Sequence, residues 1–163
     1  MLDRFKFIAG AMLACTLSAP ADAQVLMRRD ISLEMAKTMA EAAMAMCREQ
    51  GYSTSVAVVD HAANVILIMR GDGASPQNAE MARRKAFTAR MFRRTSAEWA
   101  QRTLDDPVTF PQRDLADVIA LAGGVPVMIG DEAIGAIGSA GSTQVLDDAC
   151  AKAGVAAVAD QLR

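Results

Sequence analysis

The sequence predicts an α+β fold in which an antiparallel sheet of four to five strands is flanked by helices. Two pairs of short apolar runs, within residues 56–69 and 125–137, are each joined by turn residues and predict two hairpins. Before, between and after these hairpins, apolar residues recur at helical spacing. Because hairpins pair into antiparallel sheets that bury a face under helices, the order helix, hairpin, helix, short helix, hairpin, helix favours this class.

The N-terminal segment has the three parts of a secretory signal peptide. Arg4 and Lys6 form a basic start, residues 7–17 are an apolar run too short to span a bilayer, and residues 21–23 form a small-x-small cleavage site. We expect cleavage after Ala23, which leaves residues 24–163 as a single periplasmic or secreted domain. The alternative is a helix that belongs to the fold.

Charge and hydropathy exclude several classes of partner. The formal net charge is −2, and this balance favours neither nucleic acid nor an anionic membrane as a partner. Beyond residue 23, no apolar run is long enough for a transmembrane helix. We therefore expect an exported protein without a membrane span.

The first expected helix is amphipathic. Ser32 is a suitable N-cap, Glu34 lies in the first turn, where a negative charge suits the helix dipole, and Gly51 ends the helix. Its inner face is predicted to consist of Ala36, Met39, Ala40, Ala43 and Cys47. The first hairpin follows, with strands over 56–59 and 65–69.

The second helix is expected to begin at Ser75-Pro76, a cap residue followed by proline at the first helical position. Its sheet-facing methyl groups are those of Ala79, Ala82, Ala86 and Ala89, and its cations are expected to point elsewhere, namely Arg83, Arg84, Lys85 and Arg90. Thr95 and Glu98 form a capping box for a short helix. Residues 108–122 predict a long connection with a helical turn, or a fifth strand.

The second hairpin is predicted to have strands over 125–129 and 133–137, joined by Gly130-Asp131-Glu132. Gly135 and Gly138 indicate a bulge or a close approach of another backbone. Ser142 or Thr143 is expected to cap the last helix. The inner face of that helix is predicted to consist of Val145, Leu146, Ala149, Cys150 and Ala153.

Two cysteines follow the predicted signal peptide, Cys47 and Cys150, each within a helical pattern. In an oxidising compartment such a pair invites a disulfide, which in the chain-entropy model would add about 4 to 5 kcal/mol by closing so long a loop. Because the sequence does not show that the two side chains face each other, we expect two buried thiols instead.

Two runs of sequence resemble a known family. The runs AVVDHAANVILIMRGDGASPQNAEMARRKAFTAR and GGVPVMIGDEAIGAIGSAGST are similar to the GlcG/HbpS family, which includes extracellular haem-binding proteins and the C-terminal domain of PduO-type proteins. The resemblance covers residues 31–158. It implies a profilin-like layered fold, a homo-oligomer and haem as a ligand, without implying one reaction for all members.

Three loops that contain glycine are expected to line one ligand pocket: residues 70–73, 123–126 and 138–143. The last loop joins a strand to a helix and would point free N–H groups at an anion, although this loop taken alone is also explained as a simple turn with an N-cap. A carboxylate would also meet Arg70 and Lys85. The expected ligand-binding residues are Arg70, Asp72, Gly73, Lys85, Thr88, Gly123, Gly124, Pro126, Gly141, Ser142 and Thr143.

His61 is the single histidine, so no nucleophilic triad and no zinc site can be assembled. It is either an axial ligand to haem iron or an exposed turn residue. The methionines, such as Met35, Met39, Met44 and Met46, are either metal ligands or flexible core residues.

We expect an exported protein that binds haem or a small molecule with a carboxylate. One alternative is an enzyme or enzyme accessory that acts on a small hydroxy acid, alcohol or aldehyde, with Lys85 or Asp72 as the acid or base. The other alternative is a structural oligomer without a ligand.

Overall fold

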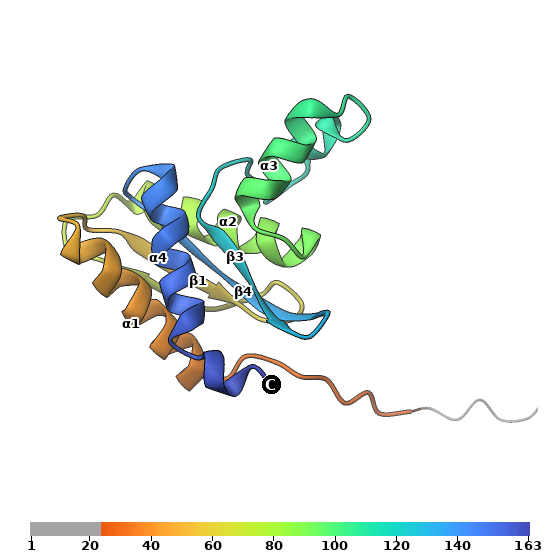
Figure 1. The fold of residues 1–163 in the computed structure, drawn as a ribbon, viewed down its shortest axis with the longest axis horizontal. Coiled ribbons are helices and arrows are strands. Elements are labelled where there is room, and N and C mark those ends of the chain that lie inside the picture. Colours follow the sequence, from red (N-terminus) through yellow and green to blue (C-terminus); the bar gives the residue numbers. More distant parts are fainter. Residues whose placement is uncertain (1–23) are drawn as a thin grey trace, which may run out of the picture.

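The computed structural model describes residues 24–163 (Figure 1), and the predicted signal peptide lies outside the described residues. Four α-helices, four strands and two short 3-10 helices follow one another in this part of the chain. In chain order they are α1 Leu33–Glu49, β1 Ser55–Val59, β2 Val65–Arg70, α2 Pro76–Phe92, α3 Ser96–Asp105, η1 Phe110–Asp114, β3 Gly124–Ile129, β4 Glu132–Ala140, α4 Gln144–Ala156 and η2 Ala159–Gln161.

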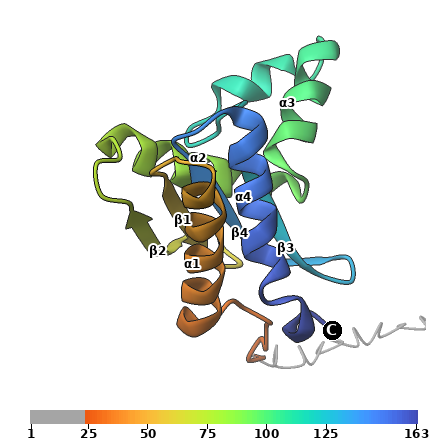
Figure 2. The ribbon, with the colours of Figure 1, turned by 60° about the vertical axis from the view of Figure 1, so that its left-hand side comes forward.

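The strands form one antiparallel sheet with the order β2-β1-β4-β3, so the two hairpins meet through β1 and β4. Helices α1 and α4 lie side by side over one face, and α2 covers the other (Figures 1 and 2). Helix α3 projects from one end of these layers. The α+β class and its layers are confirmed, and the segment 108–122 contributes η1 and no fifth strand to the described sheet.

Helix α1 follows its sequence pattern closely. The Ser32 side chain accepts a hydrogen bond from the Met35 N–H, and the five residues predicted for the inner face are the five that are buried. This face packs with Val56 and Val58 of β1 and with Ile134 and Ile137 of β4 in the main apolar core. Local capping and helical spacing were sufficient here because the helix buries only apolar groups.

Helix α2 lies unusually close to the sheet. A Cβ atom added to Gly138 in β4 would lie 2.1 Å from the Ala82 carbonyl oxygen and 2.7 Å from the Ala86 nitrogen. The missing side chain therefore brings the two backbones together, as the sequence predicted. The sheet register also shifts between Val127 and Met128, opposite Gly135, which confirms the predicted bulge.

The predicted inner face of α4 is wrong in most positions. Val145 is 83 % exposed, whereas the buried residues of the helix are Asp147, Cys150, Ala151 and Gly154. Apolar residues occur on two sides of this helix, and burial is decided by the partners of Asp147 and Cys150. Strand β4 also runs to Ala140, three residues beyond its predicted end.

The prediction of two free thiols is wrong as well, because Cys47 of α1 and Cys150 of α4 form a disulfide with a Cα–Cα distance of 5.7 Å. The two helices are direct neighbours, which sequence alone did not show. The bridge closes a loop between residues 103 positions apart.

Among the described helices, none is long and apolar enough to cross a membrane.

Candidate functional site

Lys85 does not line an open cleft. Its side chain is 2 % exposed, and its Nζ donates hydrogen bonds to Asp147 Oδ2 at 2.7 Å and to the Ser139 carbonyl oxygen at 2.9 Å. Burial lowers the pKa of Lys85, and the hydrogen bond and charge of Asp147 oppose that shift. The expectation that Lys85 would point away from the core is therefore corrected.

The anion at the start of α4 is a carboxylate of the protein itself. Asp147 Oδ1 accepts hydrogen bonds from the Ser142 N–H at 3.1 Å and the Ser142 hydroxyl at 2.7 Å. Sequence analysis expected a ligand carboxylate to meet Lys85 and the N–H groups of residues 141–143. Asp147 occupies this position, so a ligand would have to displace a buried ion pair.

Glycines make room for this ion pair. A Cβ on Gly123 would lie 3.0 Å from Lys85 Nζ and 2.6 Å from the Ser139 carbonyl oxygen, and one on Gly124 would lie 2.1 Å from the Lys85 carbonyl oxygen. Gly123 also has φ of +120°, which favours glycine. These two residues therefore serve close packing around Lys85.

Four other predicted ligand residues have structural contacts. The buried Thr88 hydroxyl accepts a hydrogen bond from the Ile119 N–H at 2.9 Å and so holds the long connection against α2. Thr143 is the N-cap of α4, and Pro126 lies in the edge strand β3 opposite Ala136. Gly141 packs against the backbone of Thr54, because a Cβ added to Gly141 would lie 3.0 Å from the Thr54 Cα.

The remaining predicted residues lie at the end of β2 and in the loop that follows it. Arg70, Asp72 and Gly73 are exposed, and the Arg70 guanidinium donates to the Ala74 carbonyl oxygen at 2.8 Å. The structure thus does not bring Arg70 and the buried Lys85 into a shared cleft. It places Asp72 at a different pocket.

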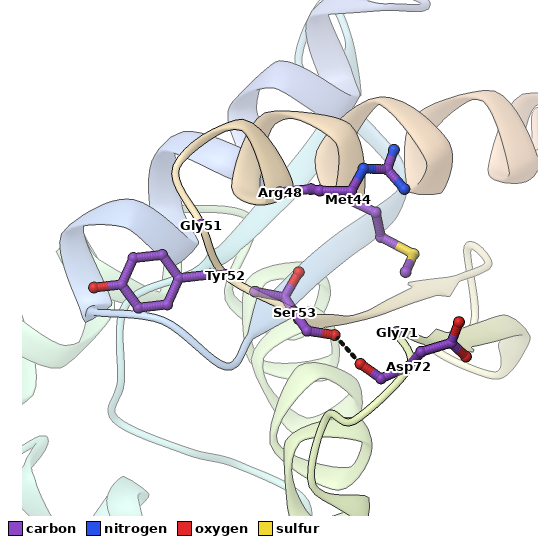
Figure 3. A pocket seen from close by; sticks show the side chains of 8 residues that line it. Met44, Arg48, Gly51, Tyr52, Ser53, Gly71 and Asp72 are labelled. Carbon is purple, nitrogen blue, oxygen red and sulfur yellow. Dashed lines mark hydrogen bonds between the residues drawn. The ribbon is translucent and has the colours of Figure 1, made fainter.

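This pocket has a volume of about 400 Å³ and lies between the end of α1, the segment that leads into β1, and the β2–α2 loop (Figure 3). Met44 and Arg48 come from one face of α1, because residues four positions apart lie one above the other on a helix. The opposite side is formed by the loop with Asp72. Its lining residues are Met44, Arg48, Gly51, Tyr52, Ser53, Thr54, Gly71 and Asp72.

Local hydrogen bonds fix the two loops of the pocket. Helix α1 ends at Glu49, and Gly51, with φ of +83°, turns the chain beyond it. The Ser53 hydroxyl donates to the Asp72 carbonyl oxygen at 2.7 Å. The Gly71 N–H donates to the Thr54 carbonyl oxygen at 3.0 Å. A Cβ on Gly71 would lie 2.6 Å from Ser53 Oγ, so a side chain there would push the loops apart.

The pocket combines a cation with apolar and aromatic surface. Arg48 is exposed and forms no ion pair within 4 Å among residues 24–163. The Met44 thioether lies beside it, and the phenol of Tyr52 lies on another side (Figure 3). A guanidinium that lacks a protein carboxylate can bind a carboxylate of a ligand.

Sequence reasoning identified the Asp72 loop and missed Arg48 and Tyr52. Arg48 was not among the residues predicted to be functional, although its position in the last turn of α1 predicts that it lies near the following loop. Only the tertiary contact between Ser53 and Asp72 shows that the two segments form one pocket.

His61 lies in the β1–β2 turn, at the opposite end of the hairpin from Ser53 and Gly71. Five strand residues separate these ends by roughly 16 Å at 3.3 Å per residue. His61 is half-buried, and its backbone N–H donates to Asp30 Oδ1 at 3.0 Å. Within the described part of the chain, no group of three or more His, Cys, Asp or Glu side chains could hold a metal ion.

Residues 31–156 match a protein family described as haem degrading protein HbpS-like. The chain belongs to the HbpS-like family. A crystal structure of a double mutant of Streptomyces reticuli HbpS is 36 % identical and covers 86 % of this chain and 97 % of that chain, with a TM-score of 0.77. Escherichia coli K12 GlcG is 30 % identical over 108 residues, which are 66 % of this chain and 79 % of GlcG.

A crystal structure of a PduOC–haem complex shares the fold at 21 % identity, with a TM-score of 0.69 over 78 % of this chain and 94 % of that chain. In this HbpS-like chain, the two runs that carry the family resemblance contribute to different parts of the structure. The first supplies Gly71 and Asp72 to the pocket and Lys85 to the buried ion pair. The second surrounds that ion pair with Gly123, Ser139 and Ser142.

Proposed function

We propose that this HbpS-like protein binds haem at the pocket between α1 and the β2–α2 loop, with a haem propionate at Arg48. The observation that carries the proposal is the guanidinium of Arg48, which has no carboxylate partner within 4 Å in residues 24–163 and lies beside the Met44 side chain. The description of the family as haem degrading and the haem complex of a protein with the same fold support this ligand.

The residues of the pocket fit the chemistry of haem. A thioether and a phenol, those of Met44 and Tyr52, are both side-chain types that bind haem iron in proteins. The volume of about 400 Å³ lies within the range of small-molecule pockets, and the open rim leaves part of a larger ligand in solvent. Bound haem would supply an iron centre, while Arg48 would orient the macrocycle by its carboxylates.

The chain's own residues also limit how the ligand lies. The hydrogen bond from Ser53 to the Asp72 carbonyl closes the floor between the two loops, and Gly71 permits this approach. The Asp72 carboxylate is exposed on the loop and would repel a propionate. The propionates would therefore be held by Arg48, away from Asp72.

Titration with hemin, followed by the Soret absorbance, tests the proposal. We expect saturable binding by the wild type and about tenfold weaker binding by Arg48→Gln, as the loss of a charge-assisted bond implies. Met44→Leu and Tyr52→Phe are expected to retain the fold, and the one that shifts the Soret band identifies the iron ligand.

His61→Gln is the matched control, because it removes the other candidate ligand at the far end of the hairpin. Unchanged binding by the Arg48, Met44 and Tyr52 variants, together with loss of the Soret band in His61→Gln, would move the site to the β1–β2 turn.

The second candidate ligand is a small hydroxy acid, whose carboxylate Arg48 would also hold. Calorimetric titration with lactate distinguishes this ligand, since it leaves the Soret region empty.

We also propose that the protein is exported with cleavage after Ala23, on the basis of the three signal-peptide features of the sequence. N-terminal sequencing of protein from an exporting host is expected to begin at Gln24. A soluble product that retains Met1 in such a host would contradict export.

We propose that the protein self-associates through the edge strand β2. Val65 and Ile68 of the edge strand β2 are 44 % and 42 % exposed, and an apolar strand edge favours association with another chain. Light scattering at micromolar concentrations should give a multiple of the mass of one chain. The mass of a single chain would contradict the proposal.

A further inference from the structure

A second cavity, of about 240 Å³, lies between the end of α2 and α3 and is surrounded by arginines. Arg93 and Arg94 follow α2, and Arg102 comes from the last turn of α3. Gln112 of η1 also lines this cavity. The pocket proposed for haem shares none of these residues.

These three arginines have no carboxylate partner, whereas a nearby arginine is neutralised by two. Arg83 of helix α2 contacts Glu80 at 2.7 Å and Asp117 at 2.6 Å. Within residues 24–163, by contrast, Arg93, Arg94 and Arg102 make no ion pair within 4 Å. The cavity therefore gathers cations from three positions without a carboxylate in contact.

Glu98 is an acidic neighbour of this cluster, and its oxygens are already occupied. Its carboxylate accepts hydrogen bonds from the Thr95 hydroxyl at 2.8 Å and the Thr95 N–H at 3.0 Å in the capping box. These hydrogen bonds lower the pKa of Glu98, with a smaller contribution from the charge of Arg94. Glu98 thus acts on the field of the cluster without forming an ion pair to it.

Rigid elements hold the cluster in place. The rings of Phe92 and Trp99 stack with centroids 4.7 Å apart beneath it, and Trp99 is 1 % exposed. Arg93 adopts the left-handed conformation, with φ of +51°, where the chain turns from α2 to α3. The backbone that carries Arg93 and Arg94 is therefore fixed, which lowers the part of the entropic cost of binding that comes from loop ordering.

We propose that this cavity binds a small molecule that carries two or more carboxylate or phosphate oxygens. Guanidinium groups recognise both kinds of oxyanion through paired N–H donors. The volume equals roughly eight water molecules at about 30 Å³ each, which suits a compact anion such as pyrophosphate or citrate. The half-buried Phe92 adds an apolar contact for the body of the molecule.

Calorimetric titration with pyrophosphate and with citrate tests the proposal on the wild-type protein. Trp99 is the single tryptophan of the chain, so intrinsic fluorescence gives a second signal at the cavity. We expect saturable binding of at least one probe, and a lower affinity at higher ionic strength. The probe that binds more tightly distinguishes phosphate from carboxylate as the preferred group.

Substitutions locate the binding. Arg94→Gln and Arg102→Gln are each expected to weaken it about tenfold, and Arg93→Asn tests the third cation with a residue that tolerates the left-handed conformation. Because these side chains lie at the surface, thermal midpoints should remain close to that of the wild type.

Arg163→Gln is the matched control, since it removes the same charge at an exposed site that lines neither pocket, and it should leave affinity for pyrophosphate and citrate unchanged. The proposal is overturned if neither probe binds saturably. It is also overturned if Arg163→Gln weakens binding as much as Arg102→Gln, which would indicate a response to net charge. Hemin binding is measured on the same variants, so this site and the haem pocket fail independently.

Discussion

The buried ion pair between Lys85 and Asp147 provides the sharpest test of the structure. Lys85→Met removes the ammonium and keeps a flexible apolar chain of similar length. The Asp147 carboxylate, of which 4 % is exposed, would then be buried with Ser142 as its remaining hydrogen-bond partner. Asp147→Leu has the converse effect and leaves the ammonium with the Ser139 carbonyl oxygen.

The expected magnitude follows from burial. Breaking a buried ion pair by removal of one partner costs about 3–5 kcal/mol, because the other charge is left without compensation. The free energy of unfolding of a domain of this size is typically about 5–15 kcal/mol, so each single substitution removes a large fraction. Replacement of both residues removes both charges, and the double variant should be more stable than either single variant.

Urea unfolding followed by circular dichroism measures these free energies in a double-mutant cycle. Lys152→Met is the matched control on α4, because Lys152 pairs with Asp148 at the surface and its side chain is 59 % exposed. It should cost less than about 1 kcal/mol. The reasoning is refuted if Lys85→Met costs no more than Lys152→Met, or if the Lys85 and Asp147 substitutions are additive.

Three further predictions concern stability. Reduction of the Cys47–Cys150 disulfide should lower the free energy of unfolding by about 4–5 kcal/mol, as measured by urea unfolding with and without reductant. Gly138→Ala should cost about 3 kcal/mol, because its Cβ meets the backbone of α2, and an unchanged midpoint would contradict the close packing. Because its pKa is lowered, the Glu98 carboxylate stabilises the folded state fully above its ordinary pKa of 4.5, and this stabilisation is lost as the pH falls through the folded-state pKa. The free energy of unfolding of Glu98→Gln, measured by urea unfolding, should therefore be lower than that of the wild type at neutral pH and equal to it in acid.

The parts of the fold that depend on local signals could be predicted from the sequence. The Ser32 and Ser75 caps, the Thr95–Glu98 capping box and the β-branched strands each act within a few residues. The four-stranded sheet followed because its hairpins are local, and only the β1–β4 pairing brings distant segments together. Local agreement of this kind is what makes a sequence specify a fold.

The errors concern groups whose partners are distant in the sequence. Lys85 and Asp147 are 62 positions apart, and Cys47 and Cys150 are 103 positions apart. A cation on a helix is normally exposed, so nothing in the pattern around Lys85 distinguishes a buried lysine from its exposed neighbours. The buried face of α4 was predicted wrongly for the same reason, because the charged Asp147 belongs to that face.

Three glycines in the runs that carry the family resemblance allow close packing of the backbone in this chain. Gly123, Gly124 and Gly138 each lie where a Cβ would meet Lys85 or the backbone of α2. The cation and the phenol of the proposed haem pocket come instead from Arg48 and Tyr52, which lie outside both runs that carry the resemblance. On the proposed haem pocket, changes at the end of α1 would alter the ligand and leave the packing around Lys85 and Asp147 in place. This separation explains why sequence alone predicts the family and fold more firmly than the ligand.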